Sequence, residues 1–431
     1  MKLTIHRGTK EIGGSCVELK TANSRILIDF GMPLVNAAKQ PFDANTLKGK
    51  SIAELKTSRI LPDISGLYTD EEKNIDAILI SHSHFDHYGL LNYVNSDVPI
   101  YMSEGARALI EVSNIFTPNK LAQINIKTIN SKKRFAISDF EVTPFLVDHS
   151  AFDALAFQIE GEGKSVFYSG DFRGHGRKST LFSKMIKDPP KSIDCLLMEG
   201  SMLGRHKQAY NNESEIERRT EKTLKEHKNI TFLFTSSQNI DRLVSAYRAC
   251  LKTDSIFVID IYTAFILEKL KKISKNIPQF NWKNIRIKFL KYHAECLANA
   301  GYRDLLYVYN KRKINLPEIN KKKNRILMLA RDNSVFPLIV KEIKGIKGSK
   351  IIYSMWGGYL TDDFRQYCEK KELILEHVHT SGHATIEDLQ EFAKALNPRK
   401  LIPIHTFESA KYPKLFENVQ VLKDGEIFNL C

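Results

Sequence analysis

The stretch Ile80-Ser81-His82-Ser83-His84-Phe85-Asp86-His87-Tyr88-Gly89 decides how the rest of the chain is interpreted. Three histidines and an aspartate fall within six residues, directly after the apolar run 77–80. Imidazole and carboxylate groups are ligands for zinc, manganese and iron(II), and a tight turn after a strand can point alternate side chains at two adjacent ions. An exposed polar loop would explain any one of these residues. The four together favour a metal site.

Composition limits the class of protein. The chain has 431 residues, of which 42% are hydrophobic, so it can bury one large core or two ordinary ones. The sequence has no apolar run of about eighteen residues and no signal-peptide pattern, so we expect a cytoplasmic protein with no membrane partner. The six cysteines are scattered, without a CxxC pair, which disfavours a disulfide framework or a thiolate zinc site. Histidine and carboxylate side chains would then have to hold any metal ion.

Positive charge is concentrated in one segment. The formal net charge is +14, yet residues 201–350 alone contain 31 Lys and Arg against 14 Asp and Glu, so the remainder of the chain is slightly acidic. Between residues 271 and 325 the basic residues are interleaved with aromatic ones, a pattern that suits a groove for a nucleic-acid strand. The alternative is a solvated helical face over a core that needs those aromatic side chains.

The spacing of apolar runs predicts an α/β protein. Strand candidates in the first part of the chain end in polar clusters, which is the usual place for functional side chains in layered α/β folds. From about residue 205 strand candidates alternate with helical patterns, which predicts a parallel sheet there. The predicted strand and helix pairs are 230–234 with 239–250, 255–259 with 263–273, 325–329 with 334–343, and 350–354 with 362–371.

The histidine-rich stretch has the form HxHxDH and resembles the signature of the metallo-β-lactamase superfamily. Further motifs of that superfamily can be matched in order. Asp29 in Leu27-Ile28-Asp29-Phe30-Gly31 resembles a structural aspartate, and Asp171 in Ser169-Gly170-Asp171-Phe172 resembles the carboxylate that bridges two ions. His149 in Val147-Asp148-His149-Ser150 and His405 in Pro403-Ile404-His405-Thr406 resemble further ligands.

The resemblance implies a fold and a ligand set. The fold is a sandwich of two mixed sheets flanked by helices, an αββα arrangement with a dinuclear metal site at one edge. The ligands of one divalent ion would be His82, His84 and His149, those of the other Asp86, His87 and His405, with Asp171 between them. Zinc is the expected metal, and manganese is the alternative.

A long insertion narrows the resemblance. His405 follows Asp171 by 234 residues, and the basic strand–helix segment lies between them. This resembles the β-CASP nucleases, in which an α/β domain is inserted over the active site. Glu199 in Met198-Glu199-Gly200 resembles an acidic motif of that group, and the stretch His379-Thr380-Ser381-Gly382-His383-Ala384 resembles the HxSGHA box of ribonuclease J and of the cleavage and polyadenylation endonuclease. We therefore expect a metallo-β-lactamase domain in two parts, 1–204 and 356–431, and an inserted β-CASP domain over 205–355.

The resemblance also implies an activity, a metal-dependent phosphodiester hydrolase, with single-stranded RNA as the expected substrate and exonuclease or endonuclease action left open. Asp86, His383 and Glu199 are the catalytic candidates. His383 would protonate the leaving 3′-oxygen, and Glu199 would orient it; a structural role for His383 is the alternative. Ser381, Gly382 and His383 are the candidate contacts for a substrate phosphate, although helix capping explains the serine equally well.

Other interpretations remain open at this stage. A DNA-directed nuclease of the same group, a hydrolase of small molecules and a catalytically silent binding subunit all fit the superfamily. The basic segment and the HxSGHA-like box argue against a small-molecule substrate, and the intact ligand positions argue against a silent subunit. Arg173 and His175 either contact substrate or form ordinary salt bridges, and the sequence leaves a homodimer open.

Overall fold

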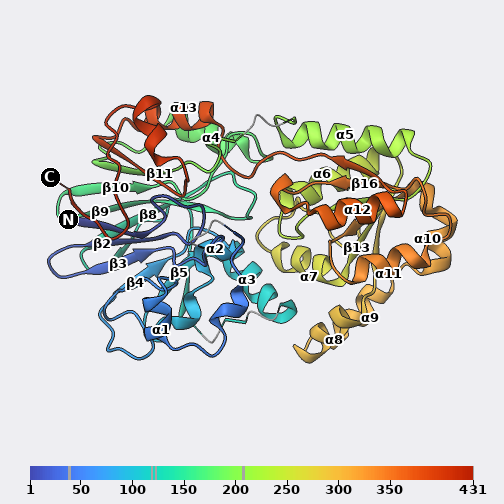
Figure 1. Ribbon diagram of the computed structural model, residues 1–431, viewed down its shortest axis with the longest axis horizontal. Coiled ribbons are helices and arrows are strands. Elements are labelled where there is room, and N and C mark those ends of the chain that lie inside the picture. Colours follow the sequence, from blue (N-terminus) through green and yellow to red (C-terminus); the bar gives the residue numbers. More distant parts are fainter. Residues whose placement is uncertain (37–39, 118–119, 122–123, 206–208, 431) are drawn as a thin grey trace.

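The computed structural model describes residues 1–36, 40–117, 120–121, 124–205 and 209–430. Two lobes lie side by side, and both ends of the chain belong to the same lobe (Figure 1). We call the lobe with both termini the sandwich lobe and the other the inserted lobe. Five of the six cysteines are free thiols, whereas Cys431 lies outside the described residues.

The first sheet of the sandwich lobe has seven strands in the order β19-β1-β2-β3-β4-β5-β6. Strands β1 to β3 and β19 are antiparallel, while β3 to β6 run parallel. The bounds are β1 (Lys2–Arg7), β2 (Cys16–Lys20), β3 (Arg25–Ile28), β4 (Ala77–Leu79), β5 (Ile100–Ser103), β6 (Ile126–Ile129) and β19 (Ile427–Asn429).

The second sheet has six strands in the order β18-β11-β10-β9-β8-β7 and is also mixed, because β10, β11 and β18 are parallel. It faces the first sheet across one hydrophobic core, to which Val17 and Leu79 contribute from one side and Phe157 and Tyr168 from the other. The bounds are β7 (Phe135–Ile137), β8 (Phe140–Leu146), β9 (Leu155–Gly161), β10 (Lys164–Tyr168), β11 (Cys195–Glu199) and β18 (Lys400–Ile404).

Helices cover the outer faces of this pair of sheets. On the second sheet, Phe182 and Phe392 of two such helices pack with Phe167 and Leu196 of the strands. On the first sheet, helical residues such as Leu55 and Ile110 pack with Ile78. The helices are α1 (Ile52–Thr57), α2 (Phe85–Tyr88) and α3 (Glu104–Phe116) on the first sheet, and α4 (Ser179–Lys187) and α13 (Ile386–Leu396) on the second. The predicted αββα sandwich is confirmed.

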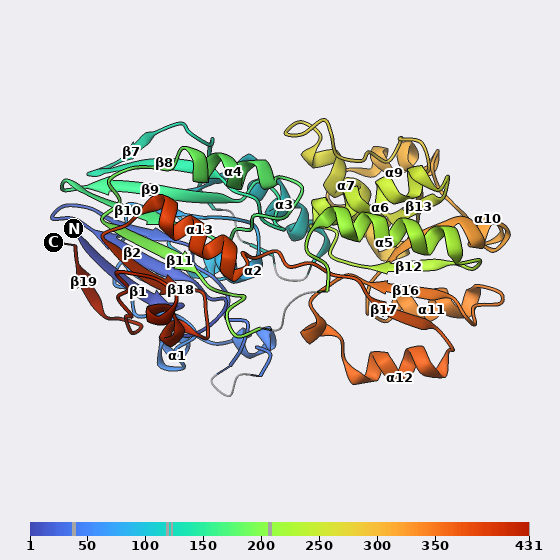
Figure 2. The same ribbon diagram turned by 90° about the horizontal axis from the view of Figure 1, so that it is seen from above.

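The inserted lobe contains one parallel sheet in the order β14-β13-β15-β12-β16-β17, with helices on both faces (Figure 2). Its side chains alternate as a strand requires: Leu233 packs in the core on one face, and Phe232 and Phe234 pack on the other. The strands are β12 (Thr231–Phe234), β13 (Ile256–Asp260), β14 (Ile285–Lys288), β15 (Ile326–Ala330), β16 (Lys350–Tyr353) and β17 (Ile374–His377). The four predicted strand and helix pairs are all present.

The helices of the inserted lobe divide between the two faces. Helices α5 to α9 contribute to the larger of its two cores, and α10 to α12 to the smaller. Their bounds are α5 (Glu213–Glu226), α6 (Ile240–Lys252), α7 (Ile261–Leu270), α8 (Lys291–Asn299), α9 (Arg303–Asn310), α10 (Leu316–Lys322), α11 (Val335–Glu342) and α12 (Asp362–Lys370). No helix in the described part of the chain is both long and apolar enough to span a membrane.

The sheet of the inserted lobe continues past residue 355. Strand β17 pairs in parallel with β16, with Tyr353 opposite His377, because α12 returns the chain to the same edge. We therefore propose that the chain re-enters the sandwich lobe after His377, about twenty residues later than the boundary expected from the sequence.

Helix α3 belongs to both lobes. Its residues Ala106 and Ile110 pack in the core beneath the first sheet, whereas Val112 and Phe116 pack in the core of the inserted lobe. Figure 1 shows α3 pointing from the sandwich lobe toward α7. Because apolar surface is buried at both ends of one helix, the two lobes hold each other in a defined position.

Candidate metal centre

The HxHxDH stretch is a strand-to-helix turn. Strand β4 ends at Leu79, and His84, which has an extended backbone, stands at the N-cap of the short helix α2. His82 lies before the turn, and Asp86 and His87 lie on the helix. The change from extended to helical backbone points side chains that are neighbours in sequence in different directions, and His82, Asp86 and His87 are all buried.

The other predicted residues reach the same place from strand ends. Asp171 and His405 follow β10 and β18, and Glu199 is the last residue of β11, which lies between those strands in parallel. His149 follows β8. Because parallel strands end at one edge of the sheet, residues far apart in sequence meet there.

The structure brings all seven predicted ligand side chains together in two adjacent groups, and a third group overlaps both. Asp171 is at the centre: its Oδ2 atom lies 3.3 Å from His87 Nε2, 3.6 Å from His405 Nε2 and 3.7 Å from His82 Nε2. The groups whose ligand atoms lie within 4.8 Å of one another are His82, His84, His149 and Asp171; Asp86, His87 and His405; and Asp171, His383 and His405. The third group was not predicted, because His383 was expected to act on the substrate.

Buried atoms without partners test whether a cation fits here. The Nε2 atoms of His82, His87 and His405 and the Oδ1 atom of Asp171 are buried and form no hydrogen bond. Leaving buried polar atoms unpaired is costly, and all four are lone-pair donors aimed into one space. Imidazole nitrogen and carboxylate oxygen are the donor set of zinc sites. The residues therefore fit a divalent cation.

A second layer of contacts fixes the histidine rings. The Nδ1 atom of His82 lies 3.0 Å from Ser81 Oγ, and that of His405 lies 3.0 Å from Ser15 Oγ. The Nδ1 atom of His149 donates to the carbonyl oxygen of Gly382, at 2.6 Å. For His149, the donor bond from Nδ1 leaves the lone pair on Nε2, the atom that faces the site. The Nδ1 atom of His405 also accepts a hydrogen bond from the backbone N–H of Gly13, at 3.2 Å.

Asp29 serves this second layer from within the sandwich. It accepts hydrogen bonds from the backbone and hydroxyl of Ser81, from the hydroxyl of Tyr168 and from His87 Nδ1, at 2.7 to 2.8 Å. Its φ is +58° and that of His405 is +55°, a strained region for residues with a side chain. Both residues directly follow strands, so the strain turns their side chains into the site.

Electrostatics keep most of the histidines neutral. Burial lowers the pKa of His82 and His149 well below the ordinary value and that of His84 to about 4. His87 differs, because the carboxylates of Asp171 and Asp29 outweigh the effect of burial and raise its pKa. Neutral imidazole is the form that binds a metal ion.

His383 and Glu199 form a pair at the edge of the cluster. The Nδ1 atom of His383 lies 3.2 Å from Glu199 Oε2 and 3.7 Å from Asp171 Oδ2. Burial lowers the pKa of His383, but the two carboxylates outweigh burial and raise it. The backbone N–H groups of Ser201 and Phe172 donate to Glu199 and hold it in place.

The predicted phosphate-binding segment is held by residues of the sandwich lobe. The backbone N–H of His383 donates to Ser381 Oγ at 3.0 Å, and Arg173 Nη1 donates to the carbonyl of Ser381 at 2.8 Å. Gly382 sits so close to Ser150 that an added Cβ would lie 2.3 Å from its Oγ atom. Only glycine fits at this position.

Arg173 forms salt bridges inside the protein and does not reach a substrate. Its side chain is fully buried and pairs with Asp148 of the sandwich lobe and with Asp241 on α6, at 2.6 Å. Next to it, Arg242 pairs with Glu213 at 2.9 Å. His175 lies 3.3 Å from Asp388. Of the two interpretations of Arg173 and His175, the structure supports the ionic one.

The aromatic residues of the basic segment mostly belong to the core. Tyr309 is fully buried, and its neighbours Phe280, Trp282, Phe289 and Tyr302 are half-buried against the larger core of the inserted lobe. Only two of the seven are exposed, Tyr292 at 55% and Tyr307 at 69%. The proposed stacking groove is therefore not present in this segment.

An aromatic pair near the cluster was not predicted from the sequence. Trp356 and Tyr359 are exposed and lie edge to face, with ring centroids 5.2 Å apart. The guanidinium of Arg205 lies 4.8 Å from the centre of the Trp356 ring. Burial and then the Asp86 carboxylate raise the pKa of Tyr359, so this ring lies within electrostatic reach of the cluster. No motif spacing signals the pair, because it depends on how the two lobes meet.

Two family models match the chain. A Beta-lactamase superfamily domain matches residues 61–231, and a Zn-dependent metallo-hydrolase RNA specificity domain matches residues 362–412. The first range includes the HxHxDH stretch and Asp171, and the second includes His383 and His405.

Curated relatives match almost the whole chain at low identity. Ribonuclease J of Helicobacter pylori (strain ATCC 700392 / 26695) is 23% identical over 99% of this chain, and ribonuclease J of Mycoplasma genitalium is 23% identical over 100%. The match covers 60% of the Helicobacter protein and 73% of the Mycoplasma protein. The chain thus spans less than two thirds of the former.

A crystal structure of a protein of unknown function from Enterococcus faecalis V583 has the same fold. The TM-score is 0.79, with 21% sequence identity and 99% of each chain covered. The sandwich, the inserted parallel sheet and the family models agree with one another. The chain therefore contains a domain of the beta-lactamase superfamily and a Zn-dependent metallo-hydrolase RNA specificity domain, and it is similar to ribonuclease J over nearly its whole length.

Proposed function

We propose that this protein is a metal-dependent ribonuclease that hydrolyses single-stranded RNA. The observation that carries the proposal is the position of Asp171, whose Oδ2 atom lies within 3.9 Å of imidazole nitrogens from both ligand groups. The similarity to ribonuclease J and the match to an RNA specificity domain favour RNA as the substrate. Since the chain covers only part of the Helicobacter enzyme, its activity stands as our proposal.

We assign two divalent ions to the cluster, with zinc as the expected metal and manganese as the alternative. His82, His84 and His149 would hold one ion, Asp86, His87 and His405 the other, and Asp171 would contact both. When bound, the ions supply Lewis acidity for the attack of water on phosphorus and neutralise charge on the phosphate oxygens.

Asp86 is the carboxylate of the set that solvent can reach, with 12% of its side chain exposed against 2% for Asp171. Its Oδ2 atom lies 3.8 Å from His405 Nε2. We propose that Asp86 is both a ligand and the group that receives a proton from the attacking water, because it is more accessible to solvent than Asp171.

His383 is the proposed general acid. The carboxylates of Glu199 and Asp171 raise its pKa, which favours the protonated form, and its ring is adjacent to Asp171, where the scissile phosphate would lie. Donating a proton to the leaving 3′-oxygen contributes typically about 10²–10⁴-fold to the rate. Glu199 is the positioning residue, because it touches His383 and backbone N–H groups of the fold.

The segment from Ser381 to His383 is the proposed contact for a substrate phosphate. It includes the general acid His383, and its backbone is held by Arg173 and by Glu199 through the adjacent Ala384. A phosphate next to the scissile one would be gripped there by the backbone and by the protonated His383 ring.

Trp356, Tyr359 and Arg205 support the preference for a single strand. Bases of a single-stranded nucleic acid can stack on exposed aromatic rings, and each stacked base contributes about 1–3 kcal/mol. A duplex keeps its bases inside the helix and cannot use these rings in the same way. Tyr359 lies within electrostatic reach of Asp86, so we propose that bases next to the cleaved bond pass this pair.

The experiment is cleavage of end-labelled single-stranded RNA and DNA of one sequence by protein loaded with zinc or with manganese. We expect RNA to be cut in preference to DNA, and product lengths to distinguish exonuclease from endonuclease action. Preferential cleavage of DNA would support the DNA-directed alternative, and no cleavage of either polymer would refute the proposal. Size measurement in solution tests for a homodimer. The cytoplasmic location stays a prediction from the sequence.

A further inference from the structure

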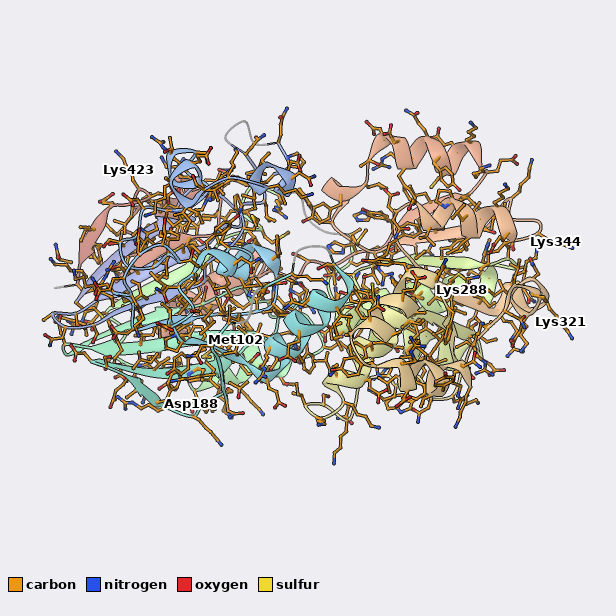
Figure 3. All side chains as sticks on the ribbon, turned by 90° about the horizontal axis from the view of Figure 1, so that it is seen from below. Met102, Asp188, Lys288, Lys321, Lys344 and Lys423 are labelled. Atoms are coloured by element: carbon orange, nitrogen blue, oxygen red, sulfur yellow. The ribbon has the colours of Figure 1, made fainter. Side chains whose placement is uncertain are left out.

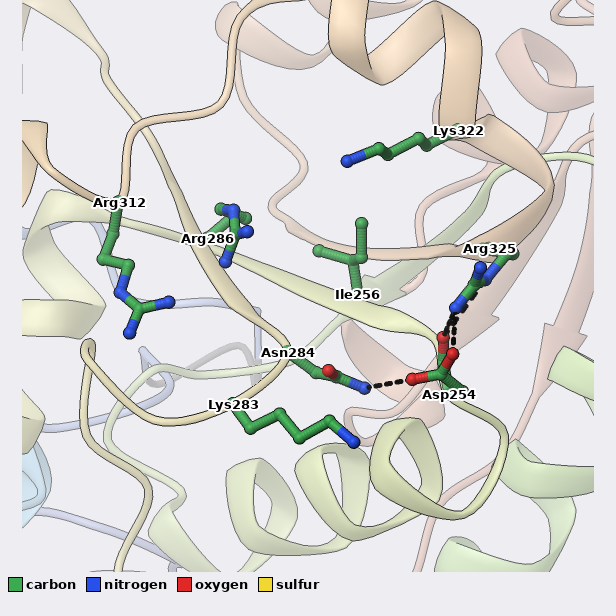
Figure 4. A pocket seen from close by; sticks show the side chains of 8 residues that line it. All are labelled: Asp254, Ile256, Lys283, Asn284, Arg286, Arg312, Lys322 and Arg325. Atoms are coloured by element: carbon green, nitrogen blue, oxygen red, sulfur yellow. Dashed lines mark hydrogen bonds and ion pairs between the residues drawn. The ribbon is translucent and has the colours of Figure 1, made fainter.

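A strongly basic pocket lies at the end of the inserted sheet that faces away from the metal centre. Its volume is about 320 Å³, and Figure 4 shows the side chains that line it. They are Asp254, Ile256, Lys283, Asn284, Arg286, Arg312, Lys322 and Arg325, five cations against one carboxylate. The size is within the usual range for small-ligand sites, about 300–1,000 Å³.

The topology of the sheet explains why these residues meet. Strands β14, β13 and β15 are neighbours and run parallel, and Asn284, Asp254 and Arg325 precede them. These residues therefore mark the amino-terminal edge of the sheet. The metal centre lies beyond the opposite edge, where Asp260 and Tyr353 end their strands. Strand β13 alone separates the two edges by about 15 Å.

Positive charge in the pocket is largely uncompensated. Asp254 is occupied already, since Arg325 pairs with it and Asn284 donates to it at 3.3 Å. Lys322 pairs with Glu318, which does not line the pocket. Among the described residues, Lys283, Arg286 and Arg312 have no carboxylate within 4.0 Å. Several cations facing one another in a concave site attract an anion.

The two free arginines are held in position by backbone contacts. The backbone N–H of Ile287 donates to the carbonyl of Arg312 at 2.9 Å, which fixes the residues after α9 against β14. Arg312 Nη2 donates to the carbonyl of Asn281 at 2.7 Å, and Arg286 Nη1 donates to that of Ile285 at 3.0 Å. Each guanidinium has five N–H donors, so most of them remain available to a ligand.

The side chains that line the pocket determine which class of ligand it can bind. Arginine guanidinium groups bind phosphate oxygens in pairs, and lysine adds a point charge. No aromatic ring lines the pocket, so it offers no platform for a nucleobase. Lys322 points from α10 toward the side of the pocket that holds Arg286 (Figure 4). The pocket therefore suits a ligand with neighbouring phosphate groups and does not require a nucleobase.

Basic side chains continue along the outer surface of this lobe. Figure 3 shows Lys321 and Lys344 at its outer end, away from the sandwich lobe. A phosphate chain that leaves the pocket would therefore still run over positive charge. This continuity favours an extended polyanion over a single small anion.

We propose that this pocket binds consecutive phosphate groups, and that it anchors the backbone of an RNA strand whose other part lies at the metal centre. Free inorganic polyphosphate offers the same chemistry and is the second source. The RNA source rests on the proposed function, whereas the binding of phosphate groups does not. Lys283, Arg286 and Arg312 would form the new contacts, and Asp254 and Arg325 would keep the shape of the pocket.

The test compares Lys283→Ala/Arg286→Ala with Lys271→Ala/Lys272→Ala, which removes the same charge from exposed positions of the same lobe. Binding to RNA of about 6 and about 40 nucleotides is measured by fluorescence anisotropy over a series of salt concentrations. For the long RNA, the pocket variant should lower the slope of log K against log salt by about 1.4, since each single-strand phosphate contact contributes about 0.7. The control pair and the short RNA should show little change.

Titration calorimetry with tripolyphosphate distinguishes the two sources. If Lys283→Ala/Arg286→Ala loses tripolyphosphate binding but binds long RNA unchanged, the pocket is an anion site and its ligand is free polyphosphate. Equal losses for the pocket and control variants, or no loss for either ligand, would overturn the proposal. Thermal melting of each variant shows that it is folded, and Arg286→Lys should restore part of the salt slope. If the wild-type protein does not cut RNA but the anion still binds, only the proposed function fails.

Discussion

The metal centre and the basic inserted lobe represent two kinds of functional surface. In the centre, each residue has a fixed partner: Asp29 holds His87 and Ser81, and Gly382 holds His149. In the lobe, the excess of positive charge is spread over many exposed side chains, and its aromatic residues largely serve the core. The residues of the metal centre lie in short motifs that can be recognised in the sequence. The arrangement of the basic side chains, on which binding depends, becomes visible only in the folded chain.

The largest effect should come from substituting Asp171, which lies at the middle of the metal centre. Asp171→Asn removes the negative charge shared by both ligand groups, and we expect the rate of RNA cleavage to fall by about 10³-fold or more. The bound metal, measured by elemental analysis, should decrease as well. The matched control is Asp97→Asn, an exposed aspartate of the same lobe. Full metal content with full activity in Asp171→Asn would contradict the bridging role.

His383→Ala separates proton transfer from metal binding. Since His383 is proposed to act on the leaving group, its loss should reduce kcat by about 10²–10⁴-fold while the metal content stays the same. Glu199→Gln should have a smaller effect on kcat and should move the limb of the pH–rate profile that reports the general acid. A loss of metal in His383→Ala would assign it to the third ligand group, with Asp171 and His405.

Glu213→Gln tests the ionic contacts between the lobes. Burial raises the pKa of Glu213, but Arg242 and Arg173 outweigh burial and lower it from 4.5 to about 2. A depressed folded-state pKa stabilises the protein above about pH 4.5, and this stability is lost as the pH falls toward 2. The variant should lose about 3 kcal/mol of unfolding free energy at pH 7.

The dependence of stability on pH should also become flatter in Glu213→Gln between pH 4.5 and 2, as measured by denaturant unfolding. Glu226→Gln, at the exposed end of the same helix α5, is the control and should unfold like the wild type. If both variants behave alike, the network around Glu213 contributes no net stability.

The smallest expected effect belongs to the aromatic pair. Trp356→Ala should raise KM for single-stranded RNA about tenfold with little change in kcat, because one stacked base contributes about 1–3 kcal/mol. The control is Tyr307→Ala, which removes an exposed ring of the inserted lobe away from the metal centre. Equal changes in the two variants would mean that the pair near Asp86 has no special role.

The sequence was sufficient for the parts that local rules determine. The alternation of strand and helix patterns predicted four strands of the inserted sheet. The resemblance of the HxHxDH stretch and its partner motifs to a known superfamily implied which residues gather. It was insufficient where the outcome depends on packing between distant segments. Strand β17 joins the inserted sheet because α12 returns to its edge, and this pairing is the basis of our proposal that the inserted lobe extends past the boundary expected at residue 355. Trp356 reaches Arg205 only across the junction of the lobes.

Gly382 links a metal ligand, the proposed general acid and a contact between the lobes. Its carbonyl orients His149, and the residues on either side of it bind Arg173 and carry the imidazole of His383. Arg173 in turn is tied to Asp241 of the inserted lobe. A wider opening of the two lobes would therefore loosen both the His149 ring, which faces the cation, and His383, the proton donor. Opening the lobes to admit a long strand would thus weaken the hold on the metal, because both depend on the same short loop.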